Sequence, residues 1–118
     1  MKLLALLFAF VSLSLAADIS GKWKADYTSP DGTARTSNFD FKVDGDKLTG
    51  KISSTRGEAE IKDGKIKGDD VTFYVIRNFN GDDVKISYSG KVSGGNIQFT
   101  VQFGDQGGFE MTAKRPTT

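Results

Sequence analysis

The chain has 118 residues, with 16 lysines and arginines against 15 aspartates and glutamates, and it contains neither cysteine nor histidine. This length predicts one domain, and the near balance of charge argues against nucleic acid or an anionic membrane as a partner. Without thiols or imidazoles the chain has no disulfide framework and lacks the commonest metal ligands, general bases and nucleophiles.

Residues 1–16 have the three parts of a secretory signal peptide. Lys2 provides the basic start, an apolar run extends from Leu3 to Leu15, and the small residues Ser14 and Ala16 precede the expected cleavage site. The apolar run falls short of the roughly 20 residues needed to cross a bilayer. We therefore expect a mature chain that begins at Ala17, is secreted or periplasmic, and has no integral association with a membrane.

Residues 17–118 read as short antiparallel strands. Glycines recur about every 11 to 13 residues, a spacing typical of strands joined in order, at Gly32, Gly45, Gly57, Gly68, Gly81 and Gly94. Between them apolar and polar residues alternate, which places every second side chain on the inner face of a sheet. The pattern predicts an all-β domain with no useful helix: an eight-stranded antiparallel up-and-down meander barrel.

The inward face of each strand follows from this alternation. In chain order we expect it to hold Ile19, Gly21, Trp23, Ala25 and Tyr27; then Arg35, Ser37, Phe39, Phe41 and Val43; then Leu48, Gly50, Ile52 and Ser54; then Ala59 and Ile61, with a bulge at Gly64 before Ile66; then Val71, Phe73, Val75 and Arg77; then Val84, Ile86, Tyr88, Gly90 and Val92; then Ile97, Phe99, Val101 and Phe103; and finally Phe109, Met111, Ala113 and Arg115.

Turn residues distinguish the two ends of this barrel. Asp44-Gly45, Lys67-Gly68 and Ser93-Gly94-Gly95 predict tight hairpins at one end, because glycine takes the positive φ that such turns require. The opposite rim is expected to carry longer connections, at residues 28–34, 55–57, 78–82 and 104–108, and to form the mouth. An internal duplication would also explain the repeated glycine turns, but shared hairpin chemistry explains them as well.

Two sites in the chain resemble a known group of barrels. Gly21-Lys22-Trp23 resembles the first-strand Gly-x-Trp of calycins (lipocalins, fatty-acid-binding proteins and avidins), and Arg115 is placed like the last-strand arginine that packs over that tryptophan. Leu48-Thr49-Gly50 looks more like avidins. The chain is also similar to short secreted bacterial β-domains with a Gly-Lys-Trp-Lys opening and an Ala-Lys-Arg ending.

This resemblance implies a binding protein in which Gly21, Trp23 and Arg115 form a structural latch, with a ligand clamp as the alternative role. Avidins line their vitamin site with several tryptophans, whereas this chain has one. Vitamin binding is therefore not carried over.

Polar residues in the inward register indicate a candidate ligand site at the mouth, formed by Tyr27, Arg35, Ser37, Ser54 and Arg77. Two arginines near one rim favour a small, anionic ligand, since guanidinium groups pair well with carboxylates and phosphates. The alternative is that these residues lie at strand ends and simply reach water. Many inward aromatic residues predict a nearly filled interior with room for at most one small ligand, whose binding is expected to alter Trp23 emission.

Other features support different functions less well. Tyr74 and Ile76 read outward and could contact a glycan or a protein partner, which makes an accessory module the alternative function. Asn78, Asn80, Asp82 and Asp83 fit turn chemistry better than a calcium loop. Glu58, Glu60 and Glu110 read as surface charges, and there is no Gly-x-Ser-x-Gly motif. We expect no enzyme activity, no metal and no cofactor.

Overall fold

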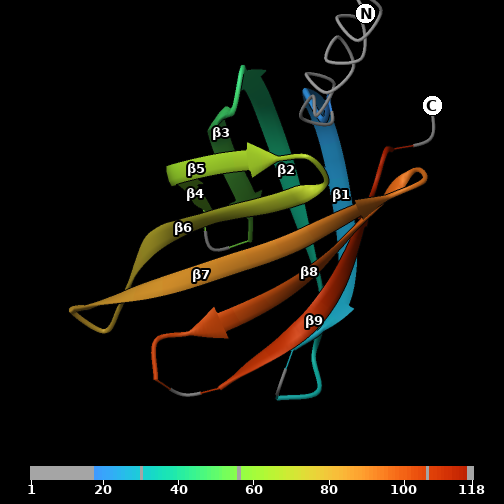
Figure 1. Ribbon diagram of the computed structural model, residues 1–118. Helices are drawn as coiled ribbons and strands as arrows, with labels where there is room; N and C mark the ends of the chain where they lie inside the picture. Colours follow the sequence, from blue (N-terminus) through green and yellow to red (C-terminus); the bar gives the residue numbers. More distant parts are fainter. Residues whose placement is uncertain (1–17, 30, 56, 106, 117–118) are drawn as a thin grey trace, which may run out of the picture.

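The computed structural model describes residues 18–29, 31–55, 57–105 and 107–116, so the predicted signal peptide lies outside the described residues. Within the described ranges the chain consists of strands and turns without a helix (Figure 1). The nine strand segments found there are β1 (Gly21–Thr28), β2 (Ala34–Asp44), β3 (Lys47–Ser54), β4 (Gly57–Glu60), β5 (Lys62–Lys67), β6 (Asp70–Phe79), β7 (Asp82–Ser93), β8 (Asn96–Phe103) and β9 (Gly108–Lys114).

These segments form one antiparallel, eight-stranded closed barrel. Successive strands pair in chain order from β1 to β3 and from β5 to β9, and β9 pairs with β1 to complete the ring. Both β4 and β5 pair with β3, because they are the two halves of one bent strand. The predicted eight-stranded, up-and-down barrel is confirmed.

The bend between β4 and β5 lies where a bulge was expected. The β5–β6 register shifts between Lys62 and Lys65, and Asp63 takes a positive φ of 52°. A Cβ at Gly64 would lie 2.1 Å from the carbonyl oxygen of Leu48, so this close approach to β3 requires glycine. Beyond the bend β4 pairs with β3, and no ladder joins β4 to β6 among the described residues.

Tight turns lie at one end of the barrel, as predicted. Gly45, Gly68 and Gly94 each take the first position of a two-residue turn, with φ of +65°, +60° and +61°. At the other rim the predictions of longer connections over residues 55–57 and 78–82 are wrong, since Ser54 pairs with Gly57 and Phe79 pairs with Asp82. Asn80 and Gly81 form a two-residue turn, with φ of 53° and 90°, that joins Phe79 to Asp82. Asn-Gly is the dipeptide most favoured in such hairpins, because both residues adopt positive φ.

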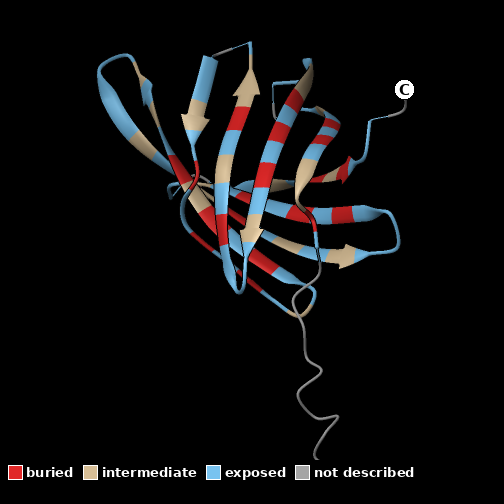
Figure 2. Cartoon of the chain, turned by 90° about the horizontal axis from the view of Figure 1, so that it is seen from above, coloured by how far each residue is buried: buried red, intermediate tan, exposed pale blue. Residues whose placement is uncertain are grey.

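The core follows the predicted inward register. Buried and exposed bands alternate along the strands (Figure 2), and the inward positions near the middle of the barrel are nearly inaccessible to solvent. Phe39, Phe73, Tyr88 and Phe99 pack on one another, with ring centroids 4.7 to 6.2 Å apart. This aromatic cluster fills the centre of the barrel and forms the base of the mouth.

Candidate functional site

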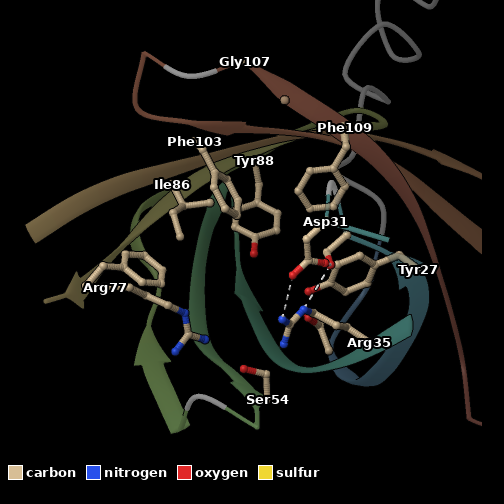
Figure 3. Close-up of a pocket in the computed structure, with 14 residues that line it drawn as sticks. Tyr27, Asp31, Arg35, Ser54, Arg77, Ile86, Tyr88, Phe103, Gly107 and Phe109 are labelled. Atoms are coloured by element: carbon tan, nitrogen blue, oxygen red, sulfur yellow. Dashed lines mark hydrogen bonds and ion pairs between the residues drawn. The ribbon is translucent and has the colours of Figure 1, made fainter. Parts of the chain in front are cut away.

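All five residues predicted for the ligand site line one pocket of about 390 Å³ at the mouth. Tyr27 comes from β1, Arg35 and Ser37 from β2, Ser54 from β3 and Arg77 from β6. Figure 3 shows both guanidinium groups directed into the same space, with Ser54 between them and the Tyr88 hydroxyl opposite. Side chains from four strands therefore converge on one volume.

Small side chains create this space. Ser37 is buried, and it follows Arg35 on the inward face of β2 just above Phe39. Ser54 occupies the matching end of β3, beyond the buried Ile52. Because serine occupies far less volume than the phenylalanines that fill the barrel below, the mouth stays open. The expectation of a nearly filled interior holds for the centre of the barrel but not for its mouth.

Aromatic side chains form the apolar wall of the pocket. The Tyr27 and Phe109 rings are stacked, with centroids 5.2 Å apart and planes 20° apart, and Phe103 meets Phe109 edge on at 5.6 Å. Phe103, Phe109 and Tyr88 were predicted to face inward but were assigned to core packing rather than to the site. Phe79 was missed because residues 78–82 were expected to form a loop.

Asp31 is a second residue that sequence reasoning missed. Its carboxylate accepts a hydrogen bond from the Ser29 hydroxyl and one of 3.0 Å from the Thr33 amide, and it lies 3.5 Å from the Arg35 guanidinium. These hydrogen bonds, with a smaller contribution from the Arg35 charge, hold the pKa of Asp31 well below its usual range. Arg35 also donates to Ser29 Oγ at 3.2 Å. Arg35 is thus tied to the β1–β2 loop.

Arg77 has different surroundings. Its Nη1 donates a 3.4 Å hydrogen bond to the carbonyl oxygen of Gly57, and this bond connects β6 to β4. Among the described residues no carboxylate lies within 4 Å of this guanidinium. Arg77 therefore brings a positive charge to the pocket that no acidic side chain in the described chain neutralises directly.

Tyr88 places a neutral phenol at the base of the pocket. Burial raises the pKa of Tyr88 above its ordinary value, with a further increase from Tyr27, while the positive charge of Arg77 acts in the opposite direction. The hydroxyl points into the pocket in Figure 3. A protonated phenol in this position can donate a hydrogen bond to a bound oxygen.

The predicted latch residues meet at the opposite end of the barrel. The guanidinium carbon of Arg115 lies 4.3 Å from the centroid of the Trp23 ring, and Arg115 Nη1 donates to the carbonyl oxygen of Ser20 at 2.8 Å. A Cβ at Gly21 would lie 2.8 Å from that same nitrogen, so glycine leaves room for the arginine. Arg115 is exposed rather than enclosed, because it covers the tryptophan from outside.

Trp23 itself is remote from the pocket. Tyr27 lies four positions further along β1, which corresponds to about 13 Å at the usual rise of a strand. Trp23 does not line the pocket. The expectation that a ligand would alter its emission therefore does not fit this geometry.

The remaining predicted features lie on the outer surface. Ile76 is 38% exposed, and Lys85 Nζ lies 4.4 Å from the centroid of the Tyr74 ring, covering part of this apolar spot. Asn78 receives a 3.1 Å hydrogen bond from the Gly81 amide, which is turn chemistry. Glu58 and Glu60 are exposed and pair with lysines at 3.6 and 3.7 Å.

The described residues contain neither a candidate metal site nor a candidate membrane-spanning helix. No group of three or more acidic, histidine or cysteine side chains is arranged to hold a metal in the described ranges. The same part of the chain includes no helix of the length and hydropathy that a bilayer span requires.

Comparisons with known proteins give no independent indication of function. No protein-family model, curated protein or solved structure matches the chain. Function is therefore inferred from the geometry of the barrel and its mouth.

Proposed function

We propose that the protein is a secreted, calycin-like binding protein that holds one small, anionic ligand with an apolar body in its mouth pocket. The observation that carries this proposal is the convergence of Tyr27, Arg35, Ser37, Ser54 and Arg77 on one pocket of about 390 Å³. Binding rather than catalysis is proposed because the sequence has neither histidine nor cysteine.

The size and lining of the pocket support this role. Small-molecule sites are usually concave, about 300 to 1,000 Å³ in volume, and lined by apolar and aromatic groups with a few polar side chains that fix orientation. Here aromatic rings, two arginines and two serines line the same pocket. An eight-stranded barrel has room for one small ligand of this kind.

The sequence and the packing support the proposals that the protein is secreted and calycin-like. Residues 1–16 have the composition of a signal peptide, which motivates the proposal that the protein is secreted or periplasmic. The contact of Arg115 with Trp23 supports the likeness to calycins, because it joins the first strand to the last at the narrow end. The ordered meander of the barrel supports the same likeness.

Filling the pocket provides the test. Ser54→Trp places an indole in the mouth, whereas Ser53→Trp places the same side chain at the neighbouring, outward position of β3. We expect small amphipathic acids to raise the melting temperature of the wild type and of Ser53→Trp but not of Ser54→Trp, because a ligand that binds only the native state stabilises it. Equal stabilisation of both variants would contradict a ligand in the mouth.

The alternative, an accessory module that binds a glycan or a protein on the outer face, stays a prediction. Ile76 is the observation that favours it, since it is an exposed apolar residue beside Tyr74. Tyr74→Ala tests it directly. Loss of glycan or protein binding with an intact response to small acids would place a second function on β6.

A further inference from the structure

The two arginines of the mouth are not equivalent. Arg35 is held by Asp31 at 3.5 Å and by Ser29 Oγ at 3.2 Å, so its guanidinium is already committed to the β1–β2 loop. Asp31 is in turn fixed by the Ser29 hydroxyl and the Thr33 amide. An incoming anion would have to compete with a carboxylate that is already in place and ionised.

Arg77 makes only one hydrogen bond to the described residues, and it is a long one. The acceptor is the Gly57 carbonyl oxygen at 3.4 Å, which carries no formal charge. Guanidinium groups form shorter and stronger hydrogen bonds with anions than with neutral acceptors. A hydrogen bond between Arg77 and an acid group in the pocket would therefore be stronger than the bond to the Gly57 carbonyl oxygen that it replaces.

Among the described residues, the charges that line the pocket add up to a single excess positive charge. Arg35 and Asp31 offset each other, and Arg77 remains. A ligand with one negative charge neutralises this excess, whereas a second negative charge would give the occupied site a net negative charge. The electrostatics of the described lining thus favour a monoanion.

The apolar wall adds a restriction of shape. The rings of Tyr27 and Phe109 are stacked, with planes 20° apart, and Phe103 meets Phe109 at an interplanar angle of 70°, so the wall consists of aromatic rings in two orientations. Planar aromatic ligands gain from offset stacking and from edge contacts with such rings, beyond the area that they bury. A flat ring system fits this wall better than a flexible chain, which must also lose conformational freedom on binding.

We infer that the pocket selects a planar aromatic monoanion whose acid group is bound by Arg77, with Arg35 acting as a positioning residue that holds the β1–β2 loop through Asp31. This inference rests on the proposed function of the same pocket. The Tyr88 hydroxyl, which faces the pocket, donates a hydrogen bond to a second oxygen of the acid group.

A pair of fluorescent probes tests the inference. 8-Anilino-1-naphthalenesulfonate and N-phenyl-1-naphthylamine share one ring system and differ by the sulfonate. We expect the wild type to bind the anionic probe about tenfold more tightly than the neutral probe, a ratio typical of one good charged hydrogen-bonding contact. In Arg77→Gln this preference falls to about threefold or less, while the double variant Asp31→Asn, Arg35→Gln, which removes both members of the offsetting pair, keeps it, even if both probes bind more weakly.

Two control variants test for binding of the dyes to the outer surface and for the effect of charge alone at position 77. Ser54→Trp should bind neither probe, which excludes attachment of the dyes to the outer surface. Arg77→Lys keeps the charge but not the planar fork, and should show a preference between those of the wild type and Arg77→Gln. Thermal unfolding of each variant shows that it is folded, and Arg77→Lys keeps the test decisive if Arg77→Gln is not.

The outcomes separate this inference from the proposed function. Equal affinity of the wild type for both probes, with binding lost in Ser54→Trp, overturns the selection of an anion and leaves a binding pocket in the mouth. Loss of the anion preference in the double variant Asp31→Asn, Arg35→Gln, with its retention in Arg77→Gln, overturns the roles given to the two arginines. No binding of either probe to the wild type contradicts both the inference and the proposed function.

Discussion

Arg115 lies over Trp23, with its guanidinium carbon 4.3 Å from the centroid of the indole ring. This contact joins the end of the last strand to the first strand at the barrel end opposite to the pocket. The same guanidinium donates to the Ser20 carbonyl oxygen, and Trp23 Nε1 donates to the Ile19 carbonyl oxygen at 2.9 Å. The segment before β1 is therefore fastened to both residues.

Arg115→Ala should lower the free energy of unfolding without affecting the mouth. The variant loses a cation–π contact and a charged hydrogen bond, which together contribute about 1 to 2 kcal/mol at an exposed position. Urea unfolding followed by Trp23 fluorescence measures the change. Lys114→Ala is the matched control and should stay within about 0.5 kcal/mol of the wild type. Similar losses in both variants would indicate that the stacking contributes nothing of its own.

Gly50→Ala should destabilise the barrel strongly. Gly50 has a φ of +142°, and a Cβ there would lie 1.9 Å from the carbonyl oxygen of Asp40 on β2. The strain and the clash together should cost about 3 kcal/mol or more, because neither strand can move without breaking the ladder. Gly95→Ala adds a methyl group where nothing lies within 4 Å and φ is not positive, so its melting temperature should be almost unchanged. A stable Gly50→Ala protein would contradict the close approach of β2 and β3.

The contribution of Asp31, in the β1–β2 loop, to the free energy of unfolding should decrease at low pH. The pKa of this carboxyl is lowered in the folded protein from its ordinary value near 3.8, so the unfolded chain takes up the proton first as pH falls. The stabilisation that the ionised Asp31 carboxylate provides is complete above the ordinary pKa. It declines as the pH falls below that value and through the lower pKa of the folded state. The difference in unfolding free energy between the wild type and Asp31→Asn should therefore shrink toward zero in acid. A difference that is constant from neutral pH to pH 2 would mean that the ionised carboxylate is not what the loop uses.

The contribution of Tyr88 to the free energy of unfolding should decrease at high pH. Burial raises the pKa of its phenol above the ordinary value near 10, so the stabilisation is complete below that value and declines as the pH rises through the higher folded-state pKa. Unfolding experiments at pH 8 and pH 11 should show a smaller alkaline loss of stability for Tyr88→Phe than for the wild type. Equal losses in the two proteins would contradict a neutral phenol at the base of the pocket.

Alternation along the strands was sufficient to predict which side chains face inward, since a side chain in a sheet can point to one of only two faces. For this reason the alternation alone predicts that Tyr27, Arg35 and Arg77 lie at one rim. Glycine at the bend was also informative, because Gly64 interrupts the pattern between Ile61 and Ile66. The two-residue alternation of the strands and the glycine turns together predict an up-and-down barrel with its strands in chain order.

Three features were not predicted from the sequence, two because they have no sequence signal and one because its signal was outweighed. Asp31 lies in a loop, where no periodicity relates a side chain to its neighbours, so its contact with Arg35 carries no sequence signal. The apolar wall of the mouth depends on Tyr27 stacking on Phe109, and composition does not specify that geometry. The tight turn at Asn80 and Gly81 did have a signal, the Asn-Gly dipeptide, but its polar neighbours favoured a longer loop.

The location of a bound ligand tests the central claim most directly. In amide ¹H–¹⁵N spectra of the mature protein titrated with 8-anilino-1-naphthalenesulfonate, the largest shift changes should come from residues around Tyr27, Arg77 and Phe109. Signals from Trp23 and Leu48, toward the end with the tight turns, should stay in place. Changes centred instead on the outer face of β6 near Tyr74 and Ile76, or the absence of any saturable change, would contradict a ligand site in the mouth of the barrel.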